Sequence, residues 1–142
     1  MKTKTLIMLS SISLLLCGIV LIFLPEEIAS YFGASHNYSL IFHTIGALYF
    51  GFGMLNWMAR DQRIGGIYGR AITVGNFSHF FVGVIPLIKL TLRNPAELPV
   101  VLITLAYLLF AAAFGYLMFR TPEAVVQRSE ELSPAINKRK RK

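Results

Sequence analysis

The sequence is poor in cysteine and in acidic residues. Its 142 residues include one cysteine, Cys17, and seven Asp or Glu residues. A single cysteine excludes an internal disulfide and any metal centre held by several cysteines. A lipoprotein anchor at Cys17 is disfavoured as well, because bulky Leu16 stands where lipidation needs a small residue.

The long apolar runs of the chain lack catalytic motifs. None of them carries a central Asp or Glu, which argues against proton-coupled export through a membrane carboxylate. The chain has no phosphate-binding glycine loop and no Ser-His-Asp arrangement. The glycines of "GALYFGFG", 46–53, lie inside an apolar run, where helix packing is their expected role. The sequence therefore names no catalytic residue and leans against an enzyme.

Apolar runs are the dominant feature that is present. Hydrophobic residues make up 55% of the chain and charged residues 15%, whereas about a quarter of the residues in soluble proteins are charged. The mean hydropathy is +0.59. Four runs reach the roughly 20 residues that a membrane-spanning helix needs, namely 6–24, 38–59, 67–92 and 98–119. We predict an all-α integral membrane protein, a four-helix bundle in which the first run is retained rather than cleaved as a signal peptide.

The net charge of +7 is distributed unevenly. Twelve of the 14 basic residues flank one side of the four runs, and only Lys89 and Arg93 flank the other. This asymmetry follows the positive-inside rule and predicts that both termini are cytoplasmic. A nucleic-acid partner is disfavoured, because the basic tail has no interleaved aromatic residues. The residues expected to set topology and meet lipid headgroups are Arg60, Arg63, Arg70, Lys138, Arg139 and Lys140.

The polar segments between and after the runs give the domain plan. We expect one four-span domain, 1–120, and a basic cytoplasmic tail, 121–142, with a brief helix starting at Thr121. After the first run, "PEEIASYFG" places Pro25 at a first helical position and Gly33 at a C-terminal cap. Its two glutamates suit the positive end of a helix dipole. The segment therefore predicts a short interfacial helix on the outer membrane surface.

Helical periodicity gives each run a stripe of small or weakly polar residues. Such stripes form helix contacts in membranes, whereas large apolar side chains face lipid. In the third run, Asn76 and His79 share the stripe, and three phenylalanines, Phe77, Phe80 and Phe81, fall outside it. We therefore expect these phenylalanines to face lipid. The helix-packing residues that this pattern predicts are Gly46, Gly53, Gly83, Ala111 and Gly115.

Asn76 and His79 are also the centre of a candidate ligand site. If the second and third runs pair about a turn near Gln62, His43 falls within about one helical turn of His79. Trp57 and Tyr107 are aromatic candidates for stacking on a ligand ring. Two interpretations stay open: these groups hydrogen-bond between helices, or they bind a ligand.

Among ligands for such a site, a quinone or another lipid-soluble molecule is favoured, because imidazole and amide groups can hydrogen-bond a carbonyl. Haem is disfavoured, since two histidines without a further motif are a weak signal. No metal site is expected, because zinc lacks a third protein ligand at that depth unless Cys17 provides one.

The pattern "LPEEIASYFG", followed by "HTIGALYFGFGMLNWMAR" and a short basic turn, resembles the DoxX-like group of small four-helix bacterial membrane proteins. The resemblance covers the layout of most of 1–120. It implies a multi-pass protein of the bacterial cell membrane, and some members of the group are linked to quinone-dependent oxidoreductase complexes. Related sequences often have an arginine near the start of the second span, where this chain has His43.

Three functional hypotheses follow. The first is an accessory or partner-binding membrane subunit of unassigned activity, with the lipid bilayer, other membrane subunits or further copies of itself as partners. The second is a redox-associated protein that binds quinone or another lipid-soluble ligand near His43, Asn76 and His79. The third, a small oligomeric transporter, is disfavoured by the missing membrane carboxylate.

Overall fold

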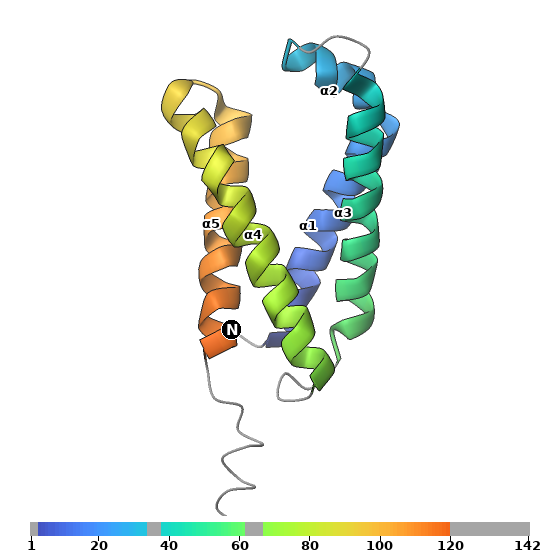
Figure 1. Cartoon of the computed structure of the whole chain (residues 1–142), viewed down its shortest axis with the longest axis vertical. Helices are drawn as coiled ribbons and strands as arrows, with labels where there is room; N and C mark the ends of the chain where they lie inside the picture. The colour runs from blue at the N-terminus through green and yellow to red at the C-terminus, as the bar shows by residue number, and fades with distance from the viewer. Residues whose placement is uncertain (1–2, 34–37, 62–66, 120–142) are drawn as a thin grey trace, which may run out of the picture. The chain divides into compact units, whose positions relative to one another are not determined.

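The computed structural model describes 3–33, 38–61 and 67–119. Within these residues the protein is all-α, as predicted, and four of its helices are long and apolar enough to cross a membrane. The described helices are α1 (Thr3–Phe23), α2 (Pro25–Tyr31), α3 (Ser39–Ala59), α4 (Ile67–Arg93) and α5 (Leu98–Phe119) (Figure 1). The expectations for Arg63, Lys138, Arg139, Lys140 and a helix from Thr121 lie outside the described residues.

The chain divides into two compact units, Met1–Asp61 and Gln62–Lys142, here called unit 1 and unit 2. In unit 1, α1 and α3 lie side by side, and α2 contacts both of them (Figure 1). In unit 2, α4 lies along α5. The single four-span domain and the four-helix bundle stay predictions.

Glycines bring the backbones of α1 and α3 into contact. A Cβ added to Gly18 would lie 2.7 Å from the backbone nitrogen of Phe50 and 2.9 Å from the carbonyl oxygen of Gly46. A Cβ on Gly53 would lie 2.8 Å from Cγ of Leu15. Real Cβ atoms do not come so close to other heavy atoms, so the pairing of these two helices requires glycine.

Buried hydroxyl and amide groups bond across the same pair of helices. Ser11 Oγ donates to the carbonyl oxygen of Gly53 at 2.7 Å, and Asn56 Nδ2 donates to Ser10 Oγ at 3.3 Å. Ser10, Ser11 and Asn56 are fully buried. In hydrocarbon such bonds contribute about 1 kcal/mol each, so they reinforce the contact that the glycines allow.

Helix α2 follows the sequence signals closely. Pro25 occupies its first turn together with Glu26 and Glu27. Gly33, just beyond the helix, has φ +66°, a left-handed conformation that favours glycine. The Gly33 N–H donates to the carbonyl of Ser30 at 3.0 Å. The predicted short helix is confirmed, and its position at a membrane surface stays a prediction.

The expectation that Phe77, Phe80 and Phe81 all face lipid is wrong for Phe80. The Phe80 side chain is 2% exposed and stacks on the Phe110 ring of α5, with ring centroids 4.7 Å apart. Phe77 also lies against α5, because a Cβ on Gly115 would be 3.1 Å from its ring. Only Phe81 is half exposed, at 50%.

The error has a steric cause. On α5, Gly115 leaves space into which the Phe77 ring of α4 fits, and Phe110 and Phe114 offer rings on which Phe80 stacks. A large residue on one helix can pack against a small residue on its neighbour as ridges fit into grooves. The size of a single side chain therefore does not decide whether it faces lipid or protein.

Two further features shape unit 2. Pro86 lies inside α4 and has no N–H, so the carbonyl of Val82 receives no helical hydrogen bond from that position. Nearer the end of the helix, the Thr91 and Thr104 hydroxyl oxygens lie 2.8 Å apart and link α4 to α5. Thr104 also donates to the carbonyl of Val100 at 2.8 Å.

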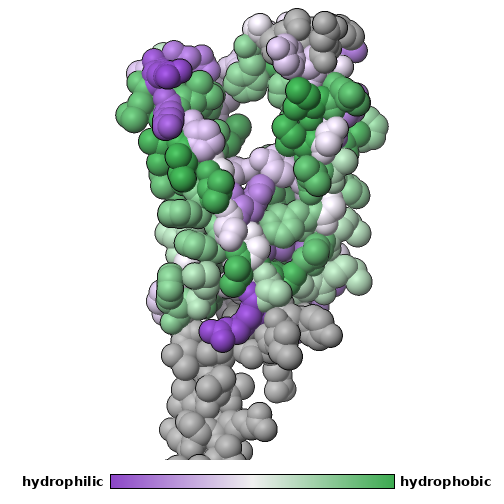
Figure 2. All heavy atoms as spheres, in the orientation of Figure 1, coloured by the Kyte–Doolittle hydropathy of each residue, from purple (hydrophilic) through white to green (hydrophobic). Residues whose placement is uncertain are grey.

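Large apolar side chains cover much of the visible surface of both units (Figure 2). Each of the four long helices has strongly exposed leucine or valine residues in its middle. Examples are Leu16 at 58%, Leu48 at 68%, Val82 at 62% and Leu109 at 72% exposed. Soluble monomers rarely expose apolar surface so extensively, whereas helices in a bilayer do.

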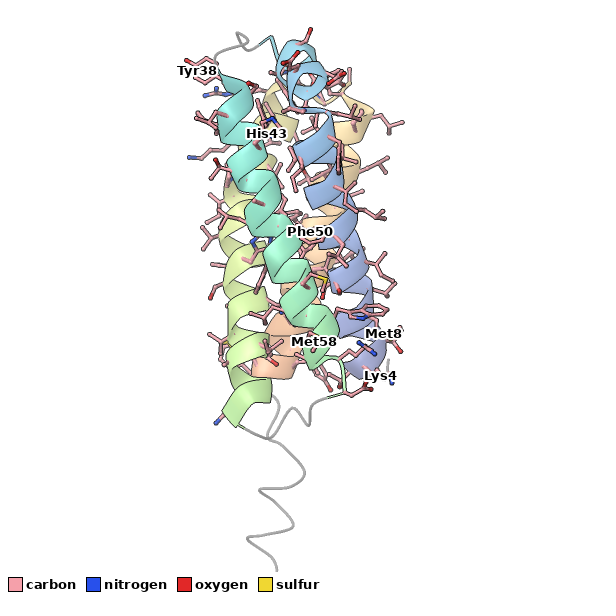
Figure 3. The ribbon with its side chains drawn as sticks, turned by 90° about the vertical axis from the view of Figure 1, so that its right-hand side faces the viewer. Lys4, Met8, Tyr38, His43, Phe50 and Met58 are labelled. Atoms are coloured by element: carbon pink, nitrogen blue, oxygen red, sulfur yellow. The ribbon has the colours of Figure 1, made fainter. Side chains whose placement is uncertain are left out.

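A cluster of three charged residues, Lys4, Arg60 and Asp61, lies at one end of unit 1. Lys4 and Met58 lie at that end and Tyr38 at the other (Figure 3). Lys4 forms an ion pair with Asp61, which also lies 3.5 Å from Arg60 Nε. The hydrogen bond from Lys4 is the main cause that holds the pKa of Asp61 below its usual value. The pair thereby joins the start of α1 to the end of α3.

This ion pair predicts a loss of stability in acid. Because the pKa of Asp61 is lowered in the folded protein, its stabilisation is present above the ordinary carboxyl pKa and is lost as the pH falls through the lowered value. We expect wild type to unfold at a slightly higher temperature than Asp61→Asn at pH 7, with the difference disappearing in acid. Thermal unfolding in detergent measures this effect, which is small because the pair is exposed.

The control is Glu27→Gln, since Glu27 is exposed and forms no ion pair within the described residues. Its unfolding temperature relative to wild type should not show the same pH dependence. Equal unfolding temperatures for wild type and Asp61→Asn at pH 7 would contradict a stabilising role of the ion pair.

Candidate functional site

His79 and Tyr107 form a polar contact between α4 and α5. The Oη atom of Tyr107 lies 3.3 Å from Nε2 of His79, and the two ring centroids are 5.6 Å apart. Both side chains are half-buried. A neutral imidazole has one donor and one acceptor nitrogen, and the Tyr107 hydroxyl can pair with Nε2 in either role.

Aromatic rings and a glycine hold this pair in place. Phe80 lies edge-on to Tyr107 at 5.1 Å between centroids and edge-on to His79 at 5.0 Å. On another side the Tyr107 ring occupies the space where Gly83 has no side chain. The Tyr107 phenol of α5 is therefore held among residues of α4.

Asn76 lies one turn before His79 on α4 and is fully buried. Its Nδ2 donates to the carbonyl of Ile72 at 2.9 Å. Thr73 makes the same kind of bond, to the carbonyl of Gly69 at 2.8 Å. Both bonds are made to backbone carbonyls of the same helix. Asn76 therefore lies near His79, but this Nδ2 hydrogen bond stays within α4.

His43 and Trp57 lie on α3, in unit 1. His43 is exposed and lies toward the Tyr38 end of the helix (Figure 3). Trp57 is near the other end, under the Arg60 guanidinium, whose Cζ is 4.4 Å from the centroid of the indole. The two residues are separated by 14 positions in one helix, or about 21 Å, so a single ring-sized ligand cannot contact both.

Of the five predicted ligand-binding residues, the described structure brings His79 and Tyr107 together, with Asn76 one turn away. A meeting of His43 with His79 joins the two units and stays a prediction. The predicted packing residues lie at helix contacts: Gly46 and Gly53 against α1, Gly83 against Tyr107 and Gly115 against Phe77, while Ala111 is buried. Arg70 is exposed.

Several polar residues escaped the sequence reasoning. Asn56 is fully buried and bonds to α1, yet it was not among the expected site residues. The signal was present, because Asn56 follows Gly53 by three positions and so shares its helix face. Thr91 also escaped, although its hydroxyl links α4 to Thr104 of α5, because hydroxyl groups that can bond their own helix give little sign of a distant partner.

The chemistry available to the described residues is hydrogen bonding. Within them no group of three or more His, Cys, Asp or Glu residues is arranged to hold a metal ion. Each buried side-chain nitrogen or oxygen in that part of the chain has a hydrogen-bond partner. The arrangement suits helix association, or a ligand that presents a carbonyl to the polar groups around His79.

No protein-family model, curated protein or solved structure matches the chain. The resemblance to the DoxX-like group therefore stays a proposal.

The ring cluster of unit 2 predicts that Phe80 matters for stability. Phe80→Ala removes ring contacts with Tyr107, Phe110 and Phe114, and each is worth about 1 kcal/mol. Phe81→Ala is the matched control, because Phe81 is 50% exposed and stacks only on Phe77 among the described rings. We expect Phe80→Ala to lower the free energy of unfolding in detergent by at least twice as much as Phe81→Ala. Equal losses of unfolding free energy in the two variants would contradict this packing and would mean that α4 presents a different face to α5.

Proposed function

We propose that this chain is a small multi-pass integral membrane protein that serves as an accessory or partner-binding subunit without catalysis of its own. The observation that carries the proposal is the set of four long apolar helices, whose buried polar side chains have hydrogen-bond partners. In unit 1 these bonds run from Ser11 to Gly53 and from Asn56 to Ser10. Polar groups used in this way stabilise helix pairs and leave the exposed apolar faces for lipid or other subunits.

We infer a four-helix bundle in a bacterial cell membrane, with both termini in the cytoplasm and α2 on the outer surface. The distribution of basic residues supports this orientation. Lys4, Arg60 and Asp61 meet at one end of unit 1, which matches the cytoplasmic side in this arrangement. Pro25 and the two glutamates that follow it begin α2 beyond the opposite end of α1.

A second candidate function is binding of a quinone or another lipid-soluble ligand. The hydrogen-bonded pair of His79 and Tyr107 favours it, because both groups can bond a carbonyl and the adjoining rings offer stacking surfaces. The resemblance to the DoxX-like group is consistent with a quinone-linked role. Haem is less suitable, because an iron ligand needs a free ring nitrogen and Nε2 of His79 faces Tyr107.

Purification from native membranes in a mild detergent tests both candidates. An accessory subunit should migrate on a native gel in a stoichiometric complex with another membrane protein. A protein that migrates alone at every detergent concentration, and carries only bulk phospholipid, would contradict both candidates.

For the second candidate, organic extraction should yield about one quinone per chain from wild type and far less from Tyr107→Phe or His79→Leu. His43→Leu is the matched control for a site centred on unit 2, and it should retain the quinone. Loss of quinone in His43→Leu would instead support the original grouping of His43 with His79. Quinone levels at background in wild type would contradict the ligand-binding candidate.

A further inference from the structure

We propose that Gly83 is the positioning residue of the site around His79, because it leaves the space in which the Tyr107 ring must lie to meet the imidazole. The inference rests on the ligand-binding candidate above for its functional meaning. Its structural content, that Gly83 sets the His79–Tyr107 hydrogen bond, can be measured without a ligand.

Gly83 and the phenol ring of Tyr107 fit closely together. A Cβ added to Gly83 would lie 2.6 Å from Cε1 and 3.1 Å from Cδ1 of Tyr107. The first distance is well inside van der Waals contact, so an alanine at this position forces the ring to move. Gly83 is one turn after His79 on α4, which aligns the ring with the histidine.

Gly83 differs from Gly18 and Gly46 of unit 1 in what its missing side chain would meet. Added Cβ atoms at Gly18 and Gly46 meet backbone atoms of the neighbouring helix, so those two glycines control how closely helices approach. The atoms nearest to Gly83 all belong to one side chain, Tyr107. The lack of a side chain at Gly83 therefore controls where the Tyr107 phenol lies, rather than how closely two helices approach.

Phe80 limits where the Tyr107 ring can move. Phe80 lies edge-on to it, with centroids 5.1 Å apart, and is itself stacked on Phe110 at 4.7 Å. Displacement of the ring lengthens the contact between Tyr107 Oη and His79 Nε2, which already measures 3.3 Å. Hydrogen bonds weaken rapidly beyond such a distance, so a small shift is sufficient to break this one.

The consequence is a change in the state of His79. With the phenol in place, Nε2 of the imidazole has a hydrogen-bond partner that holds the ring in one orientation. Without the phenol, that nitrogen loses this partner and the tautomer ratio changes. A ligand carbonyl that depends on the orientation and tautomer of His79 then binds more weakly.

The test is ¹⁵N NMR of the imidazole in Gly83→Ala. His36→Gln and His43→Gln provide a background in which His79 is the one histidine of the chain. Tyr107→Phe defines the signals of an imidazole that has lost the phenol. Gly115→Ala is the matched control, because its Cβ would meet the Phe77 ring in the same pair of helices at 3.1 Å.

We expect the His79 signals of Gly83→Ala to move to those of Tyr107→Phe, and those of Gly115→Ala to stay at the wild-type positions. We expect the affinity for decylubiquinone, added as the probe, to fall about tenfold in Gly83→Ala, the scale of one lost hydrogen bond. His79 signals in Gly83→Ala that equal those of wild type would overturn the proposal. If wild type itself binds no decylubiquinone, the ligand-binding candidate fails, and the NMR spectra alone decide whether Gly83 positions Tyr107.

A double-mutant comparison covers the case in which Gly83→Ala does not fold. Tyr107→Leu removes the ring that alanine would strike, so Gly83→Ala should cause no further loss of stability in the Tyr107→Leu background. A full additional loss in that background would show that Gly83 is needed for helix spacing, and this result would also overturn the proposal.

Discussion

The contact between the α1 and α3 backbones at Gly18 and Gly46 is the interaction on which unit 1 depends. Lipid tails are as apolar as leucine side chains, so in a bilayer burial of apolar surface gives little drive for helices to pair. The drive for helices to pair must therefore come from close backbone approach and from hydrogen bonds between helices. The approach at the glycines allows the bonds from Ser11 to Gly53 and from Asn56 to Ser10 to form. A side chain at either glycine would separate the donors from their acceptors.

Unit 2 satisfies the same constraint with rings rather than with backbone contact. Phe80 and Phe110 stack between α4 and α5, and Phe77 lies against Gly115. Helices α4 and α5 are also joined by the hydrogen bond between Thr91 and Thr104. Beside the ring contacts, His79 and Tyr107 form a polar contact set among aromatic rings. The pairing of α4 with α5 and the candidate ligand site therefore use the same residues.

The limits of sequence reasoning follow from these two kinds of packing. Composition and run length were sufficient to predict the four long helices, whose ends lie within three residues of those expected. The reason is that length and apolarity are properties of a single segment. Proline and glycine signals were sufficient for α2 for the same reason. The face of Phe80, the partner of Asn56 and the meeting of His79 with Tyr107 depend on a second helix. A pattern within one segment cannot report the residues that lie opposite it.

The central claim is that the exposed apolar faces of the long helices lie in lipid, and cysteine accessibility tests it most directly. Single cysteines would replace strongly exposed residues in the middle of each long helix, in a Cys17→Ser background: Leu16, Leu48, Val82 and Leu109. In native membranes we expect a water-soluble maleimide to leave all four unlabelled, although they are exposed on the protein, and to label them fully after denaturation in SDS. Rapid labelling of these positions in intact membranes would contradict the account.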